Sequence, residues 1–131
     1  MSAKLTDFYV LKMNKETKEM YAVKTHGSEF THKGCLVRAY IDERHTMFFI
    51  DPKTGLTFES YCLPFVPGYD DAIERQYLKR AERYIQWKPF RKYKKTIENN
   101  PEEHAVWIRK FEAAPRYESE QEVLDDISKG M

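Results

Sequence analysis

The sequence predicts an α+β fold, in which an N-terminal five-stranded antiparallel sheet is followed by about four C-terminal helices that pack on it. Residues 8–63 contain short runs of aromatic and β-branched residues separated by turn residues. After Pro67 the apolar residues recur at nearly every fourth position instead of every second. No internal repeat and no long linker divides the chain, so we expect residues 1–131 to form a single domain.

Three strands are predicted in the first third of the chain. The runs 8–13 and 19–25 flank a polar loop that begins at Asn14, an arrangement typical of a hairpin. Residues 35–41 alternate, with Cys35 and every second residue after it on one face. This alternation indicates a half-buried strand.

A second hairpin is predicted around residues 51–55. Pro52 presets φ for a turn, and Gly55 can adopt the left-handed conformation that returns the chain. The turn joins a strand over 46–51 to a strand over 56–61. Because Met47 to Ile50 are apolar on both alternating faces, we expect the first of these strands in the interior of the sheet. The five strands then form a meander.

The first helix is predicted over 70–87, because its apolar residues from Ile73 to Leu78 and beyond fall within one arc. Pro89 is expected to end this helix, since proline lacks the N–H that a helix interior uses. A second, short helix is then expected to start on Pro89. It presents Phe90, Tyr93 and Ile97 on one face.

The last two helices have N-terminal capping signals. Asn100 precedes Pro101, which suits the first helical position, and Glu103 occupies the capping-box place. Ser119 and Glu122 have the spacing of a capping box for the fourth helix.

Charge is distributed unevenly, although the net charge of the whole chain is only +1. The basic helical segment, 68–97, contains nine basic and four acidic side chains, a net charge of +5. The acidic helical segment, 98–131, contains four basic and nine acidic side chains, a net charge of −5. This asymmetry indicates either a charged partner or pairing of the two segments with each other.

Basic residues alternate with aromatic ones between residues 79 and 95, a combination that suits a macromolecular interface. Trp87 falls outside the predicted apolar arc, so it is either an exposed anchor or a side chain buried where the chain turns. The nine residues that we expect to bind a partner, here called the basic-aromatic surface, are Arg80, Arg83, Trp87, Phe90, Arg91, Lys92, Tyr93, Lys94 and Lys95.

Catalytic motifs are absent from the sequence. It contains no phosphate-binding glycine loop, no zinc-protease motif and no nucleophile-elbow motif. Asp42, Glu43, His45 and Asp51 are the residue types of a metal-dependent nuclease, but they flank turns in which Asp is common for backbone reasons. We therefore expect a protein that is not an enzyme.

Metal, cofactor and disulfide sites are not expected either. His32 and Cys35 have the spacing of half a zinc site, but no second half follows at a familiar spacing. Cys35 and Cys62 are predicted on strands separated by a third, beyond the reach of a disulfide. The other possible ligands of a zinc ion are His26 and His45.

The sequence-based hypothesis is a non-enzymatic module that docks its basic-aromatic surface on a protein, such as one that handles nucleic acid or its complex. Direct binding of single-stranded or structured nucleic acid by the same surface is the alternative, and a nuclease is third. In its size, charge and aromatic content the chain resembles small proteins of phages and mobile elements that bind and block host machinery. No membrane helix or signal peptide is evident, so we expect a cytoplasmic protein with reduced cysteines.

Overall fold

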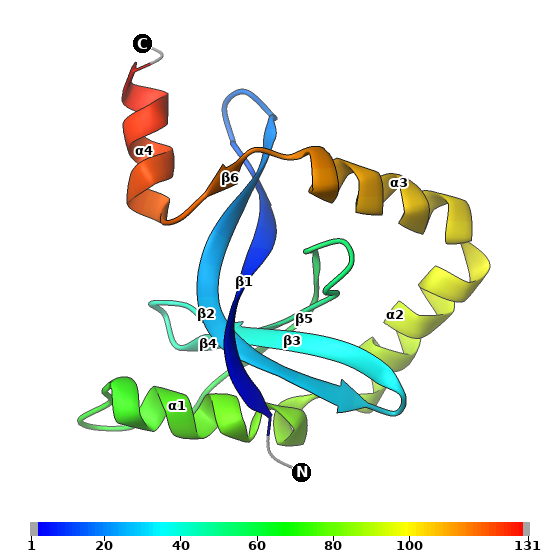
Figure 1. Cartoon of the computed structure of the whole chain (residues 1–131). Coiled ribbons are helices and arrows are strands. Elements are labelled where there is room, and N and C mark those ends of the chain that lie inside the picture. The colour runs from blue at the N-terminus through cyan, green and yellow to red at the C-terminus, as the bar shows by residue number, and fades with distance from the viewer. Residues whose placement is uncertain (1–2, 130–131) are drawn as a thin grey trace.

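A computed structural model describes residues 3–129 and contains an antiparallel sheet followed by helices (Figure 1). The predicted α+β class is confirmed. The five main strands are β1 (Lys4–Met13), β2 (Met20–His32), β3 (Cys35–Ile41), β4 (Thr46–Ile50) and β5 (Thr57–Cys62). They lie in the order β1-β2-β3-β4-β5, each antiparallel to the next, so the predicted meander is also confirmed.

Strand β2 is much longer than predicted, and different parts of it pair with β1 and with β3. It runs for 13 residues, pairs with β1 from Met20 to Glu29, and pairs with β3 from Gly27 to His32. A Cβ atom on Gly27 would lie only 2.1 Å from the carbonyl oxygen of Ala39. Glycine at position 27 thus permits the close approach of β2 to Ala39 of β3. The sequence pattern did not reveal that β2 continues beyond residue 25, because polar residues and a glycine follow there.

The turn between β4 and β5 closes back on the outer edge of β1. Gly55 has a φ of +68°, as predicted, and its N–H donates to the carbonyl of Asp51 at 2.8 Å. The N–H of Leu11 in turn donates to the carbonyl of Gly55 at 2.9 Å. This contact joins β1 to the β4–β5 turn, so that the sheet curls and its first and last hairpins meet.

The helices are α1 (Asp71–Lys79), α2 (Trp87–Asn99), α3 (Pro101–Ala113) and α4 (Glu120–Lys129), with a short 3-10 turn, η1 (Ala81–Tyr84), after α1. The predicted first helix over 70–87 is therefore wrong in its C-terminal half. Helix α1 ends at Lys79, and α2 begins at Trp87, two residues before the predicted start at Pro89. Pro89 therefore lies in the first turn of α2 and not at the end of the preceding helix. A proline is tolerated there because the first N–H groups of a helix have no partner within the helix.

The capping predictions have mixed outcomes. The Oγ of Ser119 accepts a hydrogen bond from Glu122 N at 3.2 Å, which confirms the cap of α4. Asn100 precedes α3 as predicted, but its side chain donates to the carbonyl of Thr96 at 3.2 Å and so caps the end of α2 instead. One residue thus serves the junction of two helices.

A sixth, two-residue strand, β6 (Arg116–Tyr117), was not predicted. It pairs in parallel with Ala22 and Val23 of β2, beyond the end of β3. This short pairing brings the chain between α3 and α4 back to the sheet.

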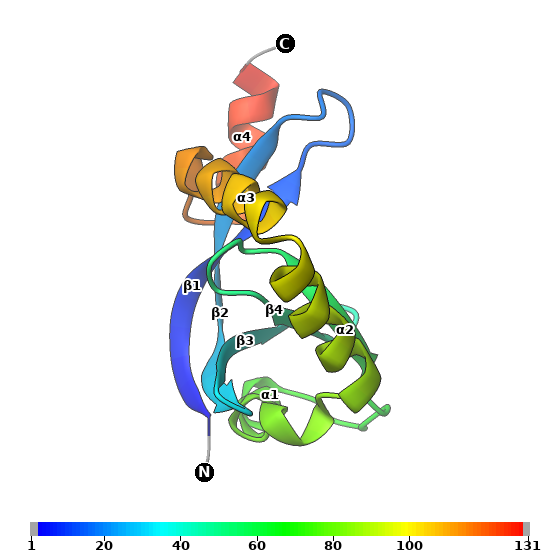
Figure 2. The ribbon, with the colours of Figure 1, turned by 90° about the vertical axis from the view of Figure 1, so that its right-hand side faces the viewer.

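The main hydrophobic core lies between the sheet and helices α1 and α2. Phe49 and Met47 of β4, which are fully buried, pack there with Leu78 of α1 and Phe90 of α2. Helix α1 lies at one end of the sheet, and α3 and α4 lie at the other (Figures 1 and 2). None of the described helices has the length and apolar composition needed to cross a lipid bilayer.

Candidate functional site

Helix α2 and the turn before it display most of the cationic part of the basic-aromatic surface. The exposed cations of this surface lie at the start of η1, on η1 itself and on the outer face of α2. Lys94 of α2 is half-buried. The exposed cations of this surface are Arg80, Arg83, Arg91, Lys92 and Lys95, and Lys88 of the same helix is exposed beside them.

Phe90 must be removed from the predicted partner-binding residues because it has no exposed surface. Its ring packs edge-on against His32 at a centroid distance of 4.7 Å. Tyr93, three residues later on the same face, is half-buried and stacks on Phe58 at 4.1 Å. The i, i+3 spacing of Phe90 and Tyr93 is typical of the core face of an amphipathic helix. The two rings therefore face the core, although their neighbours in the sequence are cations.

Trp87 is the exposed aromatic side chain of this surface. It is 54% exposed at the first position of α2, so the alternative of a buried tryptophan at the turn is wrong. The Nζ of Lys33, in the turn between β2 and β3, lies 4.1 Å from the centroid of its ring. Lys33 therefore adds a cation to the surface, and no local signal in the sequence relates these two residues, which are far apart in the chain.

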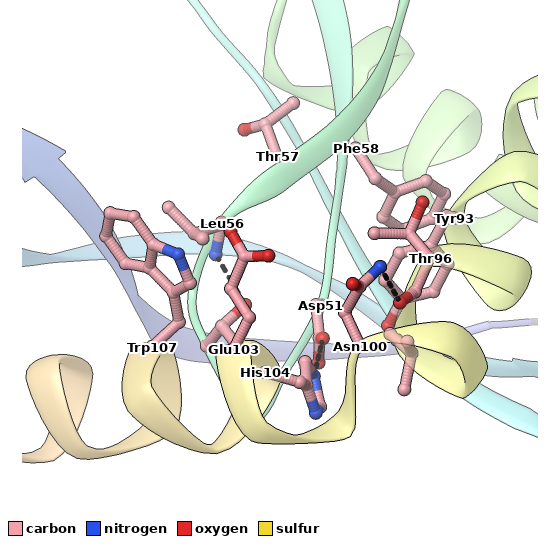
Figure 3. A pocket seen from close by; sticks show the side chains of 12 residues that line it. Asp51, Leu56, Thr57, Phe58, Tyr93, Thr96, Asn100, Glu103, His104 and Trp107 are labelled. Atoms are coloured by element: carbon pink, nitrogen blue, oxygen red, sulfur yellow. Dashed lines mark hydrogen bonds and ion pairs between the residues drawn. The ribbon is translucent and has the colours of Figure 1, made fainter.

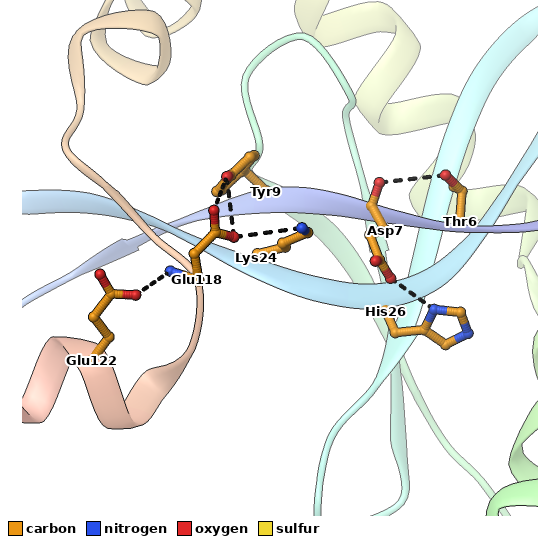
Figure 4. A network of polar contacts seen from close by, with 7 residues as sticks. All are labelled: Thr6, Asp7, Tyr9, Lys24, His26, Glu118 and Glu122. Carbon is orange, nitrogen blue, oxygen red and sulfur yellow. Dashed lines mark hydrogen bonds and ion pairs between the residues drawn. The ribbon is translucent and has the colours of Figure 1, made fainter.

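The acidic helical segment does not neutralise this surface, because its paired carboxylates contact the N-terminal hairpin instead. Glu120 lies 2.7 Å from the Nζ of Lys12, and Glu118 lies 3.5 Å from the Nζ of Lys24. Glu118 also accepts a hydrogen bond from the hydroxyl of Tyr9 at 3.4 Å (Figure 4). The opposite net charges suggested that the acidic helical segment pairs with the basic one, but its ion pairs are with β1 and β2 instead.

The pairing of Lys12 is strong enough to affect its pKa. Burial alone would lower the pKa of Lys12, but its hydrogen bond to Glu120 and the nearby negative charge raise it overall. By contrast, within residues 3–126, whose side chains the structure describes, no Lys or Arg of the basic-aromatic surface lies within 4.0 Å of a carboxylate. Apart from the half-buried Lys94, its cations are therefore exposed and form no ion pair with the side chains that the structure describes.

The four residues considered for a nuclease lie in different surroundings and do not form one site. Asp42 accepts hydrogen bonds from the N–H groups of Arg44 and Thr46, both at 3.0 Å, and so stabilises its turn. His45 stacks on Tyr69 at 3.9 Å. Asp51 is buried, and Glu43 is exposed.

The candidate zinc ligands are also dispersed. His26 contacts Asp7 at 2.8 Å, and His32 packs on Phe90. Cys35 and Cys62 are both free thiols, on β3 and β5, with β4 between them. In the described part of the chain, no three His, Cys, Asp or Glu side chains gather as metal ligands would.

A cleft that the sequence did not predict lies between the β4–β5 turn and the corner joining α2 to α3 (Figure 3). Its volume is about 220 Å³. At its floor Asp51, only 4% exposed, lies 2.7 Å through Oδ2 from the Nε2 of His104. Burial, together with the negative charge and hydrogen bonding of Asp51, raises the pKa of the Tyr93 hydroxyl at the side of this cleft.

His104 was missed because its partner lies 53 residues away in the sequence. A partial signal exists, since His104, Trp107 and Phe111 share one face of α3 at helical spacing. That spacing places His104 toward the sheet but does not identify Asp51 as its partner.

Comparison of the chain with protein-family models, with curated proteins and with solved structures finds no match.

Proposed function

We propose that this chain is a non-enzymatic binding module that docks its basic-aromatic surface on an acidic surface of a protein partner. The observation that carries the proposal is the exposed Trp87 among cations that form no ion pair within 4.0 Å in the described part of their own chain. Tryptophan and arginine are the residues that most often dominate the binding energy of protein interfaces. An interface centred on Trp87 and Arg91 would combine apolar burial with charge complementarity.

The distribution of aromatic side chains favours a protein over a nucleic acid. Binding of single strands relies on several exposed rings on which successive bases stack. Here Phe90 is buried and Tyr93 is covered by Phe58, so Trp87 is left as the exposed ring of the surface. A hollow lined by Lys88, Lys92 and neighbouring side chains lies beside α2 and offers a place for an acidic side chain of the partner.

Direct nucleic-acid binding is the second candidate, and one observation favours it. The acidic helix α4 lies at the end of the molecule opposite α1 and η1, so its charges are remote from Arg80 and Arg83 (Figure 1). An approaching polyanion would then meet a locally positive surface despite the small net charge.

The partner that we propose is a nucleic-acid-handling protein or its complex in the cytoplasm. Such an assembly presents carboxylates and phosphates together, and both complement the exposed cations of α2. A small inhibitor or adaptor of the phage type would act by occupying that surface.

The test compares charge reversal inside and outside the surface. Arg91→Glu combined with Lys92→Glu should abolish capture of a protein from a nuclease-treated lysate of the source cells. Arg109→Glu combined with Lys15→Glu reverses two exposed charges on other elements and should leave capture unchanged.

The same variants are titrated with a 20-nucleotide oligothymidylate at about 150 mM salt. If the partner is a protein, we expect no saturable binding of the oligonucleotide. Saturable binding that weakens linearly in log affinity against log salt, at a slope of about −0.7 per neutralised phosphate, would establish the nucleic-acid alternative instead. If neither a protein nor the oligonucleotide responds to the reversal at Arg91 and Lys92, both candidates are wrong.

A further inference from the structure

The cleft between the β4–β5 turn and α2–α3 has walls of aromatic side chains and a floor of ionisable ones. Phe58 and Tyr93 lie on one side and Trp107 on the other, with Glu103 and Asp51 between them (Figure 3). Leu56 and Ile97 add further apolar surface. Clefts of this composition, apolar with a few converging polar groups, are typical of ligand sites.

The charges that line the cleft are negative on balance. Asp51, Glu103 and His104 are the ionisable carboxylate and imidazole groups there, and no Lys or Arg is among the described lining residues. Asp51 is already engaged, since it accepts a hydrogen bond from Lys53 N at 2.9 Å and contacts His104 at 2.7 Å. Glu103 has no ion-pair partner within 4.0 Å among residues 3–126.

The lysines of α2 do not alter this balance inside the cleft. Lys88 and Lys92 line the neighbouring hollow, which lies beside the stacked pair of Phe58 and Tyr93. The side chains that α2 presents to the cleft beyond that pair, such as Thr96 and Ile97, carry no charge.

Aromatic faces attract cations, and one ring of this cleft already does so. The Nζ of Lys110 lies 4.4 Å from the centroid of the Trp107 ring. An ammonium or guanidinium group over an aromatic face gains further stability when it is shielded from water.

We propose that this cleft binds an organic cation, namely a primary ammonium or guanidinium group on an alkyl stem. The stem lies between Trp107 and the Phe58–Tyr93 pair, and the charged group faces the carboxylate of Glu103. This site is distinct from the cationic face of α2 that the proposed function uses, and the two can be tested separately.

The test follows the two tryptophan indole N–H signals in a two-dimensional ¹⁵N NMR spectrum. The chain contains two tryptophans, and Trp87→Phe assigns the signals. Titration with n-butylammonium should shift the Trp107 signal in a saturable manner and leave the Trp87 signal in place. The neutral isostere 1-butanol should bind at least about fivefold more weakly, because it carries no charge to pair with Glu103.

A matched pair of variants locates the charge that matters. Glu103→Gln should weaken binding of n-butylammonium by about fivefold, whereas Glu102→Gln, on the same helix but outside the cleft, should change it by less than about twofold. N-acetyl-lysine methylamide and N-acetyl-arginine methylamide are titrated in parallel. Tighter binding of these than of n-butylammonium identifies a peptide side chain as the ligand, and the reverse identifies a free amine.

Three results would overturn the proposal. The first is the absence of any saturable shift of the Trp107 signal. The second is equal binding of 1-butanol or tighter binding of pentanoate, which carries the same butyl stem. The third is an equal effect of Glu102→Gln and Glu103→Gln. None of these outcomes tests the basic-aromatic surface, because its own test changes Arg91 and Lys92, and Tyr93, which borders both sites, is unchanged in either test.

Discussion

At the scale of single residues, Gly55 shows how one position can be fixed by two independent requirements. Its φ of +68° disfavours any residue with a side chain, and a Cβ atom there would lie 2.7 Å from the ring of Phe111. The backbone N of Leu11 lies 3.0 Å from the same point. The turn, β1 and α3 thus meet at a glycine.

We expect Gly55→Ala to lower the free energy of unfolding by more than about 2 kcal/mol, because left-handed strain adds to displacement of Phe111. Gly34→Ala is the matched control, since Gly34 also has a positive φ, +81°, but a Cβ atom there would meet nothing within 4 Å. The control should lose only about 1 kcal/mol. Urea unfolding monitored by circular dichroism measures both, and equal losses would contradict the packing argument.

Glu59 makes a pH-dependent contribution to stability. It is 7% exposed, and burial raises its pKa above the usual value of 4.5, although the hydrogen bond from Gln86 N at 3.1 Å opposes the rise. The folded state therefore holds this proton more tightly than the unfolded state does. Consequently the free energy of unfolding falls as the pH rises from about 4.5 through the folded pKa.

Glu59→Gln removes this pH dependence while keeping an oxygen that accepts from Gln86. The variant should gain stability relative to the wild type as the pH rises from about 4 to about 7, measured by urea unfolding at several pH values. Glu112→Gln, which changes an exposed carboxylate, is the control. A stability difference for Glu59→Gln that does not vary with pH would show that burial does not affect this carboxyl.

At the scale of elements, α3 is attached to the sheet by the contact between His104 and Asp51. A similar pair joins His26 to Asp7 at 2.8 Å, but both of its side chains are more than half exposed. The two pairs therefore have nearly equal geometry and different burial.

His104→Ala should cost about 3 kcal/mol of unfolding free energy, because it leaves the buried carboxylate of Asp51 without its imidazole partner. His26→Ala should cost less than about 1 kcal/mol, because water solvates the exposed Asp7 that remains. Thermal and urea unfolding measure both values. A small cost at His104 would mean that α3 is held by Phe111 and its apolar neighbours alone.

The elements that were predicted correctly are those specified by local sequence. Residues 35–41 alternate in polarity between two turns, and β3 has the predicted bounds. The errors arise where distant residues decide. The half of β2 beyond Gly27 depends on pairing with β3, and Phe90 is buried because β2 and β5 cover it.

In the candidate sites too, features set by local sequence were predicted, and contacts between distant residues were not. The cations of α2 were predicted from consecutive residues, and they are exposed apart from the half-buried Lys94. The Asp51–His104 pair and the contact of Lys33 with Trp87 depend on the tertiary fold, so no sequence period could reveal them.

At the scale of the whole molecule, the curled sheet separates the two kinds of charge. The paired carboxylates of the acidic segment lie on the N-terminal hairpin, whereas the basic cluster of α2 and η1 has no carboxylate partner in the described residues. A net charge of +1 therefore conceals an uneven surface. Our central claim is that a protein partner covers the part of this surface around Trp87.

Site-specific photo-crosslinking tests that claim most directly. A benzophenone amino acid is placed at Trp87 in one variant and at Val106, an exposed apolar residue of α3, in another. Both proteins are irradiated in the source cells. We predict a discrete protein adduct from position 87 that resists nuclease and is missing from position 106. Adducts that contain only nucleic acid, or the same adducts from both positions, would contradict a protein interface centred on Trp87.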